Sequence, residues 1–362
     1  MIPTTTSAPQ EPIPPTSTVS SSPALDAIAA AYLVACRAPG AAVGTENGDG
    51  TVSVSIAGEL ASGRALTADS QFLAGSVTKL FVATVALQLI AEHQLSMTDT
   101  IDRFLPGWPS GDRITVEMLL GHRSGMGDFG NDFGAELRDL VLADLSRVFH
   151  YDEVLDLVRA VPPVAEPGTT YHYTNAGYIV LGAILQQVTG RSLGQLMQER
   201  IIGPLGLEHT IYGPDDLDAA AEIELHGLFD VTGDGNAIDI AGLPVAAALT
   251  VDPAGAGVIS TLRDLLTFTQ SLFGTDRLLG TRERAELRKA VSTLDSPAVL
   301  LPDAFDVIGH GGASPGAQVM VAHDVAHATT AVVWCNRLDP GAAELDPSLV
   351  ALHDTLELLA GG

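Results

Sequence analysis

The sequence predicts an α+β fold in which one antiparallel sheet, flanked by N- and C-terminal helices, is assembled from both ends of the chain around an inserted helical domain. Strand-like runs occur near the N-terminus and again in the last 50 or so residues, whereas the patterns between them are mostly helical. With 362 residues and 46% hydrophobic content, the chain can bury a large core. We expect a disordered Pro/Ser/Thr-rich tail at 1–23, a sheet domain at 24–95 and 252–362, and an all-helical insertion at 96–251.

The first part of the predicted sheet domain begins with a helix, continues through two strands and ends with a second helix. Apolar residues at helical spacing mark both helices, and a Gly48-Asp49-Gly50 turn joins the two strands. The second helix is apolar over 80–91, but this run is too short and too often interrupted to span a bilayer. The helices are expected over 24–37 and 76–93, and the strands over 41–45 and 51–57.

Proline and glycine interrupt the helical middle of the chain, as they do in loops between helices. Its clearest helix covers 177–188 and is expected to end at Gly190, and Ser192 is a plausible cap for the next helix. Ser260-Thr261 is expected to cap a helix that runs through Leu272. The remaining elements are two strands and a C-terminal helix with a leucine stripe, at 317–322, 329–334 and from Asp346-Pro347 onward.

Composition and charge exclude several classes of partner. The formal charge of −26 argues against nucleic acid and anionic membrane surfaces, because both would repel the chain. The tail at 1–23 has too few large apolar residues to fold alone. The sequence as given contains neither a secretory signal nor a transmembrane segment. For Cys36 and Cys335, two buried thiols are the favoured interpretation over a disulfide.

Ser76-Val77-Thr78-Lys79 is the segment with the clearest chemical signature. At the start of a helix, this spacing places the hydroxyl and the amine on one face, within reach of each other. The chain has only two lysines, Lys79 and Lys289, against sixteen arginines. Unlike a guanidinium, an amine can lose its proton when desolvated, so a lysine fits beside a nucleophile that must hand on a proton. A solvated pair on a surface helix is the alternative, which this motif alone does not exclude.

Two further motifs follow, Tyr173-Thr174-Asn175 and His310-Gly311-Gly312. Together with the first, they resemble the serine β-lactamase and D-alanyl-D-alanine carboxypeptidase family, which also contains esterases. The resemblance is closest to class C β-lactamases and the related secreted, penicillin-binding-protein-like carboxypeptidases. It covers the chain from about Pro39 onward, with S-x-x-K, Y-x-N and H-x-G in the family's order. It implies a β-lactamase/transpeptidase-like fold and an exported protein of the cell envelope or extracellular space.

The resemblance implies that Ser76 attacks the substrate carbonyl and forms an acyl-enzyme, which water later hydrolyses. Lys79 would hold or remove the hydroxyl proton. Tyr173 is the second candidate base, since a neighbouring ammonium stabilises a phenolate, and packing in an aromatic cluster is the alternative for this side chain. Asn175 would hydrogen-bond both Lys79 and the substrate amide, with a turn residue before the next helix as the alternative.

The third motif is expected at the start of a strand that lines a cleft between the sheet and the helical insertion. There the imidazole of His310 would replace the lysine of K-T-G enzymes as an electrostatic element. Gly311 and Gly312 would allow the substrate to approach closely. The oxyanion hole would consist of two backbone N–H groups, those of Ser76 and Ala313.

A second serine and one acidic loop offer competing interpretations. Gly312-Ala313-Ser314-Pro315-Gly316 matches the nucleophile elbow of α/β-hydrolases, but the elbow needs an N–H on the residue after the serine, and Pro315 has none. The segment 230–241 begins like a calcium loop, yet Ala241 stands where a bidentate glutamate is required. The histidines show no zinc-binding spacing. We expect neither a metal nor a cofactor.

The departures from the family pattern concern substrate choice. Carboxypeptidases and β-lactamases hold a substrate carboxylate, and a hydroxyl commonly follows the Lys or His of their third motif, whereas this chain has Gly311 there. No arginine or lysine occurs between Lys289 and Arg337. We therefore expect an esterase-like serine hydrolase acting on small-molecule or short-peptide esters or amides. The alternatives are a D-alanyl-D-alanine carboxypeptidase or β-lactamase, and a non-hydrolytic penicillin-binding sensor. No feature of the sequence indicates an oligomeric state.

Overall fold

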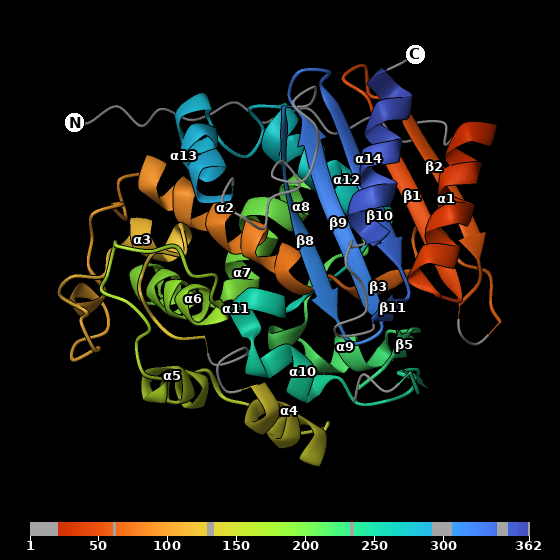
Figure 1. Ribbon diagram of the computed structural model, residues 1–362. Coiled ribbons are helices and arrows are strands. Elements are labelled where there is room, and N and C mark those ends of the chain that lie inside the picture. The colour runs from red at the N-terminus through yellow and green to blue at the C-terminus, as the bar shows by residue number, and fades with distance from the viewer. Residues whose placement is uncertain are drawn as a thin grey trace.

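The computed structural model describes residues 21–60, 63–128, 134–231, 235–291, 306–338 and 347–360. Its centre is a five-stranded antiparallel sheet with the strand order β2-β1-β10-β9-β8 (Figure 1). The sheet joins both ends of the chain, as predicted, because β1 pairs with both β2 and β10. The strands are β1 (Gly40–Glu46), β2 (Val52–Gly58), β8 (Val307–Ser314), β9 (Ala317–Asp324) and β10 (Thr329–Cys335).

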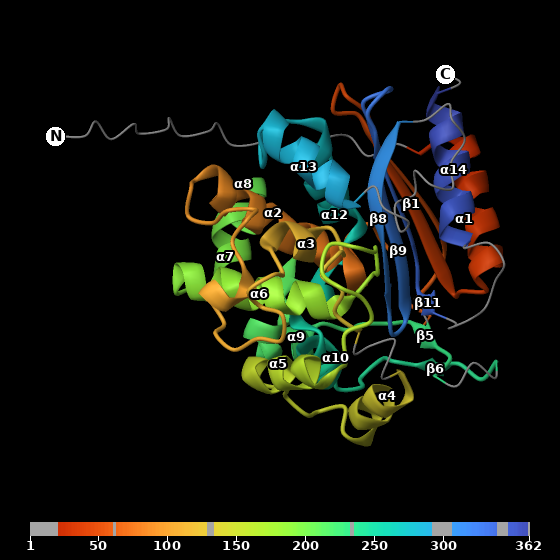
Figure 2. The same ribbon diagram turned by 60° about the vertical axis from the view of Figure 1, so that its left-hand side comes forward.

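Helices cover both faces of this sheet (Figure 2). On one face lie α1 (Pro23–Cys36) and α14 (Pro347–Ala360), which pack against each other and against the strands. On the other face lie α12 (Leu262–Thr269) and the largely buried α2 (Thr78–Ala91). The alternation of side chains along β9 explains the two layers, since Val319 and Val321 belong to the core on the α2 face and Met320 to the core on the α1 face.

Two small three-stranded sheets accompany the main one, and their strands of two to four residues are too short to show a periodicity in sequence. They are β3-β7-β4, with β3 (Gln71–Leu73), β7 (Val258–Thr261) and β4 (Ile211–Tyr212), and β11-β5-β6, with β11 (Arg337–Leu338), β5 (Leu228–Phe229) and β6 (Ile238–Asp239).

The segment between β3 and β7 is mainly helical. Its α-helices are α2, α3 (Val116–Leu120), α4 (Gly134–Ala143), α5 (Tyr151–Ala160), α6 (Asn175–Thr189), α7 (Leu193–Met197), α8 (Gly203–Leu205), α9 (Leu217–Glu222), α10 (Ala246–Val251) and α11 (Pro253–Ala256). After α12 comes α13 (Thr281–Val291). The division into a sheet domain and a helical insertion stays a prediction.

The predicted helix ends agree with the structure at several positions. Gly190 ends α6 in the left-handed conformation, with φ 66°. Ser192 caps α7 through a reciprocal capping box with Gln195, and the Thr261 hydroxyl accepts the N–H of Asp264 at the start of α12. These ends depend on contacts within a few residues of chain, which is why the local sequence predicts them.

The two cysteines confirm the favoured interpretation, because Cys36 and Cys335 are buried thiols of the core between the sheet and α1. The predicted disordered tail lies outside the described residues up to position 20, and its last residue, Pro23, is in fact the first residue of α1. No described helix is long and apolar enough to cross a bilayer.

Candidate active site

Ser76 lies in a short 3₁₀ turn, Gly75–Val77, that connects β3 to α2. Its hydroxyl oxygen accepts a hydrogen bond of 3.0 Å from Nζ of Lys79, one turn further along. The predicted spacing therefore brings the two groups into contact. The alternative of a solvated surface pair is wrong, because Lys79 is only 1% exposed.

Lys79 is held by three acceptors at once. Besides Ser76, its Nζ donates to Oδ1 of Asn175 at 2.6 Å and to the carbonyl oxygen of Gly255 in α11 at 3.3 Å. Burial lowers the pKa of Lys79, but its interactions with the Tyr173 hydroxyl and with the carboxylates of Asp252 and Asp128 outweigh burial, so that the pKa is raised. Lys79 is therefore an ammonium near neutral pH.

Tyr173 approaches Ser76 from the loop before α6, and its hydroxyl donates to the Ser76 oxygen at 2.9 Å. Its ring also packs on the imidazole of His122, with 4.4 Å between the ring centres. Tyr173 therefore both packs in an aromatic cluster and contacts the candidate nucleophile, so the two interpretations of this side chain are compatible. Burial is the main cause that lowers the pKa of His122 well below its usual value, so the tyrosine rests on an uncharged ring.

Asn175 is the first residue of α6, and its side chain lies between Lys79 and a buried carboxylate. Its Oδ1 accepts from Lys79, while its Nδ2 lies 3.5 Å from Oδ2 of Asp128. Asn175 is thus a contact residue of the lysine, as predicted, and not merely a turn residue before the helix.

His310 is the fourth residue of β8, not the first residue of a strand as predicted. Its ring centre is 6.2 Å from that of Tyr173, on the same side of the sheet as Lys79. Burial, and secondarily the charge of Lys79, lowers the pKa of His310 to about 4. The Nδ1 atom lies 2.6 Å from the carbonyl oxygen of Gly311, which requires the proton on Nδ1. His310 is therefore neutral at pH 7 and supplies no positive charge.

The strand β8 passes very close to the turn that carries Ser76. A Cβ atom on Gly75 would lie 2.7 Å from the carbonyl oxygen and 2.8 Å from the nitrogen of Ala313, and one on Gly312 would lie 2.2 Å from the carbonyl oxygen of Ala74. Only glycine permits this approach, and the φ of +52° at Gly75 adds a second reason for it. The close contact brings Ala313 next to the turn that carries Ser76, and the oxyanion hole formed by the N–H groups of these two residues stays a prediction.

The side chain of Ser314 connects two strands. Its buried hydroxyl donates to the carbonyl oxygen of Leu73 at 2.7 Å and so ties β8 to the end of β3. Pro315 and Gly316 then form the two-residue turn of the β8–β9 hairpin, with φ 72° at Gly316. A nucleophile elbow needs a strand followed by a helix, so the competing interpretation of Ser314 is wrong.

Two arginines that are distant from the motifs in sequence are engaged with other groups. Arg123 donates to the carbonyl oxygen of Gly168 at 3.2 Å, and Arg263 forms an ion pair with Asp69 at 2.6 Å. At Gly311, where related enzymes carry a hydroxyl, an added Cβ atom would have the ε-methyl of Met320 as its nearest neighbour, at 3.5 Å.

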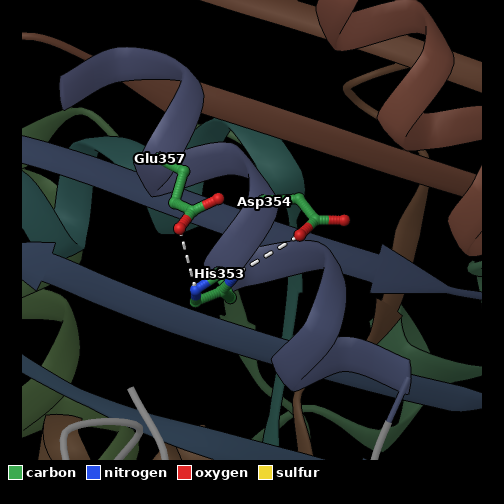
Figure 3. Close-up of side chains that lie close together, drawn as sticks. All are labelled: His353, Asp354 and Glu357. Atoms are coloured by element: carbon green, nitrogen blue, oxygen red, sulfur yellow. Dashed lines mark hydrogen bonds and ion pairs between the residues drawn. The ribbon is translucent and has the colours of Figure 1, made fainter. Parts of the chain in front are cut away.

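Among the described residues, one group could hold a metal ion, and it lies on α14, the helix that covers the opposite face of the sheet. It consists of His353, Asp354 and Glu357 (Figure 3). Each ring nitrogen of His353 faces a carboxylate oxygen, at 3.2 Å for Asp354 and 3.3 Å for Glu357. The calcium-loop segment is described only in part, and there Oδ2 of Asp230 accepts the N–H of Gly235 at 2.7 Å.

Three residues of the site were missed in the sequence, namely His122, Asp128 and Asp252. Burial is the main cause that raises the pKa of Asp252 to about 6, while the nearby Lys79 lowers it. Asp252 caps α11, and its position before a proline was a local signal for this role. Nothing in the local sequence indicates that Asp128 reaches α6.

Comparison with known proteins identifies the family of the chain. The sequence model of the Beta-lactamase family matches residues 25–355. Penicillin-binding protein 4 of Amycolatopsis lactamdurans is 32% identical over 161 residues, which cover 43% of this chain and 39% of that protein. The match thus spans less than half of that relative's own length.

Solved structures share the fold. A D-stereospecific amidohydrolase from Streptomyces sp. superposes with a TM-score of 0.75 at 24% identity, covering 91% of this chain and 97% of the other. The D-amino acid amidase from Ochrobactrum anthropi SV3, solved with L-phenylalanine amide, gives a TM-score of 0.76 at 20% identity, covering 93% and 98%. At these identities the likeness concerns the fold, and it confirms the predicted α+β architecture.

Proposed function

The chain belongs to the Beta-lactamase family of serine hydrolases, and from this premise we propose that it uses Ser76 to form an acyl-enzyme with uncharged esters or amides. The proposal is supported mainly by the two hydrogen bonds of the Ser76 hydroxyl oxygen, which accepts from the Lys79 ammonium at 3.0 Å and from the Tyr173 hydroxyl at 2.9 Å. A serine so placed has a proton acceptor and a neighbouring charge in hydrogen-bond reach.

In the proposed acylation, Tyr173 reacts as the phenolate, formed when its hydroxyl proton is released, and the Ser76 oxygen attacks the carbonyl carbon while the serine proton passes to the phenolate oxygen. The raised pKa of Lys79 supports the tyrosine as the acceptor, because an ammonium has no free electron pair but does stabilise a phenolate. The carbonyl oxygen becomes an oxyanion, which accepts hydrogen bonds from the backbone N–H groups of Ser76 and Ala313. The proton then passes to the leaving alcohol or amine, and water releases the acyl group by the reverse sequence.

The preference for uncharged substrates follows from the third motif. A carboxylate beside the reacting carbonyl needs charge-assisted donors, each worth about 1.5–3 kcal/mol. Here His310 is neutral, Gly311 has no side-chain donor, and Arg123 and Arg263 are engaged elsewhere. We therefore expect neutral short-chain esters to be the preferred substrates. The D-amino acid amidase was solved with L-phenylalanine amide, which has no carboxylate, and this supports small amides without a carboxylate as a second class of substrate.

A substrate panel tests the proposal. We expect kcat/KM for neutral p-nitrophenyl esters to exceed that for a chromogenic cephalosporin and for a D-Ala-D-Ala peptide, by at least about tenfold for one missing charge-assisted bond. Methylation of the peptide's terminal carboxylate should cost little. A large loss of rate on methylation would instead support a carboxypeptidase, and a burst of one equivalent without turnover would support a penicillin-binding sensor.

A further inference from the structure

We propose that Asp128 is a positioning residue of this site, whose buried carboxylate fixes the side-chain amide of Asn175 with its oxygen toward Lys79. The assignment rests on the proposed function, since it gives Asp128 a task in the reaction of Ser76. Asp128 lies in the loop before α4 and is 0% exposed.

Asp128 binds the N-terminus of α6 through several donors. Its Oδ1 accepts the backbone N–H of Asn175 at 2.8 Å and the hydroxyl of Thr174 at 3.2 Å, and its Oδ2 faces Nδ2 of Asn175 at 3.5 Å. A fully buried carboxylate is costly unless such donors surround it, and the helix N-terminus adds a favourable dipole. The carboxylate therefore holds both the backbone and the side chain of Asn175.

This arrangement determines the direction of the Asn175 amide. In the observed orientation the amide oxygen accepts from the Lys79 ammonium at 2.6 Å, and the amide nitrogen faces a carboxylate. The flipped orientation would place the amide nitrogen against an ammonium and the amide oxygen against a carboxylate, so both contacts would become repulsive. Asp128 thus removes the alternative in which Lys79 loses its acceptor and turns away from Ser76.

The charge of Asp128 acts on Lys79 as well. Together with Tyr173 and Asp252, it favours the ammonium form against the effect of burial, while the neighbouring rings of His122 and His310 are uncharged. Loss of the Asp128 charge should therefore lower the pKa of Lys79. Because the proposed reaction needs the ammonium form of Lys79, activity should then be lost at a lower alkaline pH than in the wild type.

Asp128→Asn tests the proposal against a matched control. Asp264→Asn removes a second buried carboxylate that likewise accepts a backbone N–H, of His209 at 2.9 Å, and a threonine hydroxyl, of Thr210 at 2.7 Å, without contacting the site. We expect Asp128→Asn to lower the acylation rate with a p-nitrophenyl ester by about tenfold or more, and to shift the alkaline limb to lower pH. Asp264→Asn should change only thermal stability. Equal pH profiles in all three proteins would overturn the proposal.

A double-mutant cycle isolates the route of the effect. If Asp128 acts through the amide, Asp128→Asn should change the acylation rate less in an Asn175→Ala background than in the wild type. Full additivity would contradict the assignment. Should Asp128→Asn fail to fold, Asn175→Asp serves instead, because two facing carboxylates must share a proton and activity should then survive only at acidic pH. A wild-type pH profile of Asn175→Asp would refute the role.

The failure of this proposal can be told apart from failure of the proposed function. If wild type and Ser76→Ala were labelled equally by a fluorophosphonate, the proposed acyl-enzyme at Ser76 would be refuted. Normal labelling and turnover at Ser76, combined with unchanged kinetics of Asp128→Asn, would refute only the positioning role.

Discussion

Gly75→Ala is expected to disable the proposed oxyanion hole without removing any side chain of the site. The added methyl group would lie 2.7 Å from the carbonyl oxygen and 2.8 Å from the nitrogen of Ala313, whereas ordinary contact begins at 3.4 Å. The turn or strand β8 must therefore move by about 0.7 Å, which separates the two N–H groups of the proposed oxyanion hole, those of Ser76 and Ala313. Losing one such donor costs about 10²–10³ in kcat.

The substitution also introduces a left-handed alanine, with φ +52° at this position, which costs about 1–2 kcal/mol of stability. Gly190→Ala provides the matched control, because Gly190 has φ +66° at the end of α6 and its added methyl group would meet no atom within 4 Å. The left-handed alanine should lower the free energy of unfolding by a similar amount in both variants, but only Gly75→Ala should lose catalytic activity.

The assay is the pre-steady-state acylation rate with a p-nitrophenyl ester, together with thermal unfolding of both variants. We expect Gly75→Ala to acylate about 100-fold more slowly than wild type and Gly190→Ala to acylate normally. If Gly75→Ala acylated within about threefold of wild type, the hole would not be formed by these backbones.

Three further predictions concern the residues around the hole. Ser76→Ala should abolish covalent labelling by a fluorophosphonate, whereas Ser314→Ala should keep it and lose about 1 kcal/mol of stability with the bond to Leu73; labelling with the opposite pattern would contradict the nucleophile assignment. Lys79→Arg should be nearly as inactive as Lys79→Ala in ester hydrolysis, because a buried site with three acceptors for one ammonium has no room for a guanidinium; an active Lys79→Arg protein would argue against this. The pKa of His310 falls from 6.5 to about 4 on folding, so between these pH values the unfolded chain binds one more proton than the folded chain. The contribution of the neutral His310 ring to the stability of the folded state is therefore complete above about pH 6.5 and is lost as the pH falls toward 4. In thermal unfolding from pH 4 to 7, His310→Gln should be less acid-sensitive than wild type, and an identical pH dependence would count against the burial argument.

The sequence alone predicted those features that depend on neighbouring residues. Helical spacing identified the helices that became α1, α2, α6 and α12, and small polar or glycine residues identified the end of α6 and the starts of α7 and α12. The three-residue spacing of Ser76 and Lys79 was enough to predict their contact, because one helical turn brings them together. The motifs in their family order then indicated the β-lactamase-like fold, which the structure confirms.

Tertiary structure alone decided how the distant parts of the site meet and which of them carry charge. Tyr173 and Asn175 reach Ser76 and Lys79 across 97 and 96 residues of chain, and no local pattern indicates such a contact. Asp128 adds a carboxylate that the sequence analysis did not identify. The neutral state of His310 and the ammonium of Lys79 depend on burial and on neighbouring charges. Both are set by the packing of α2 against α6 and of β8 against the Ser76 turn, rather than by the residues on either side in sequence.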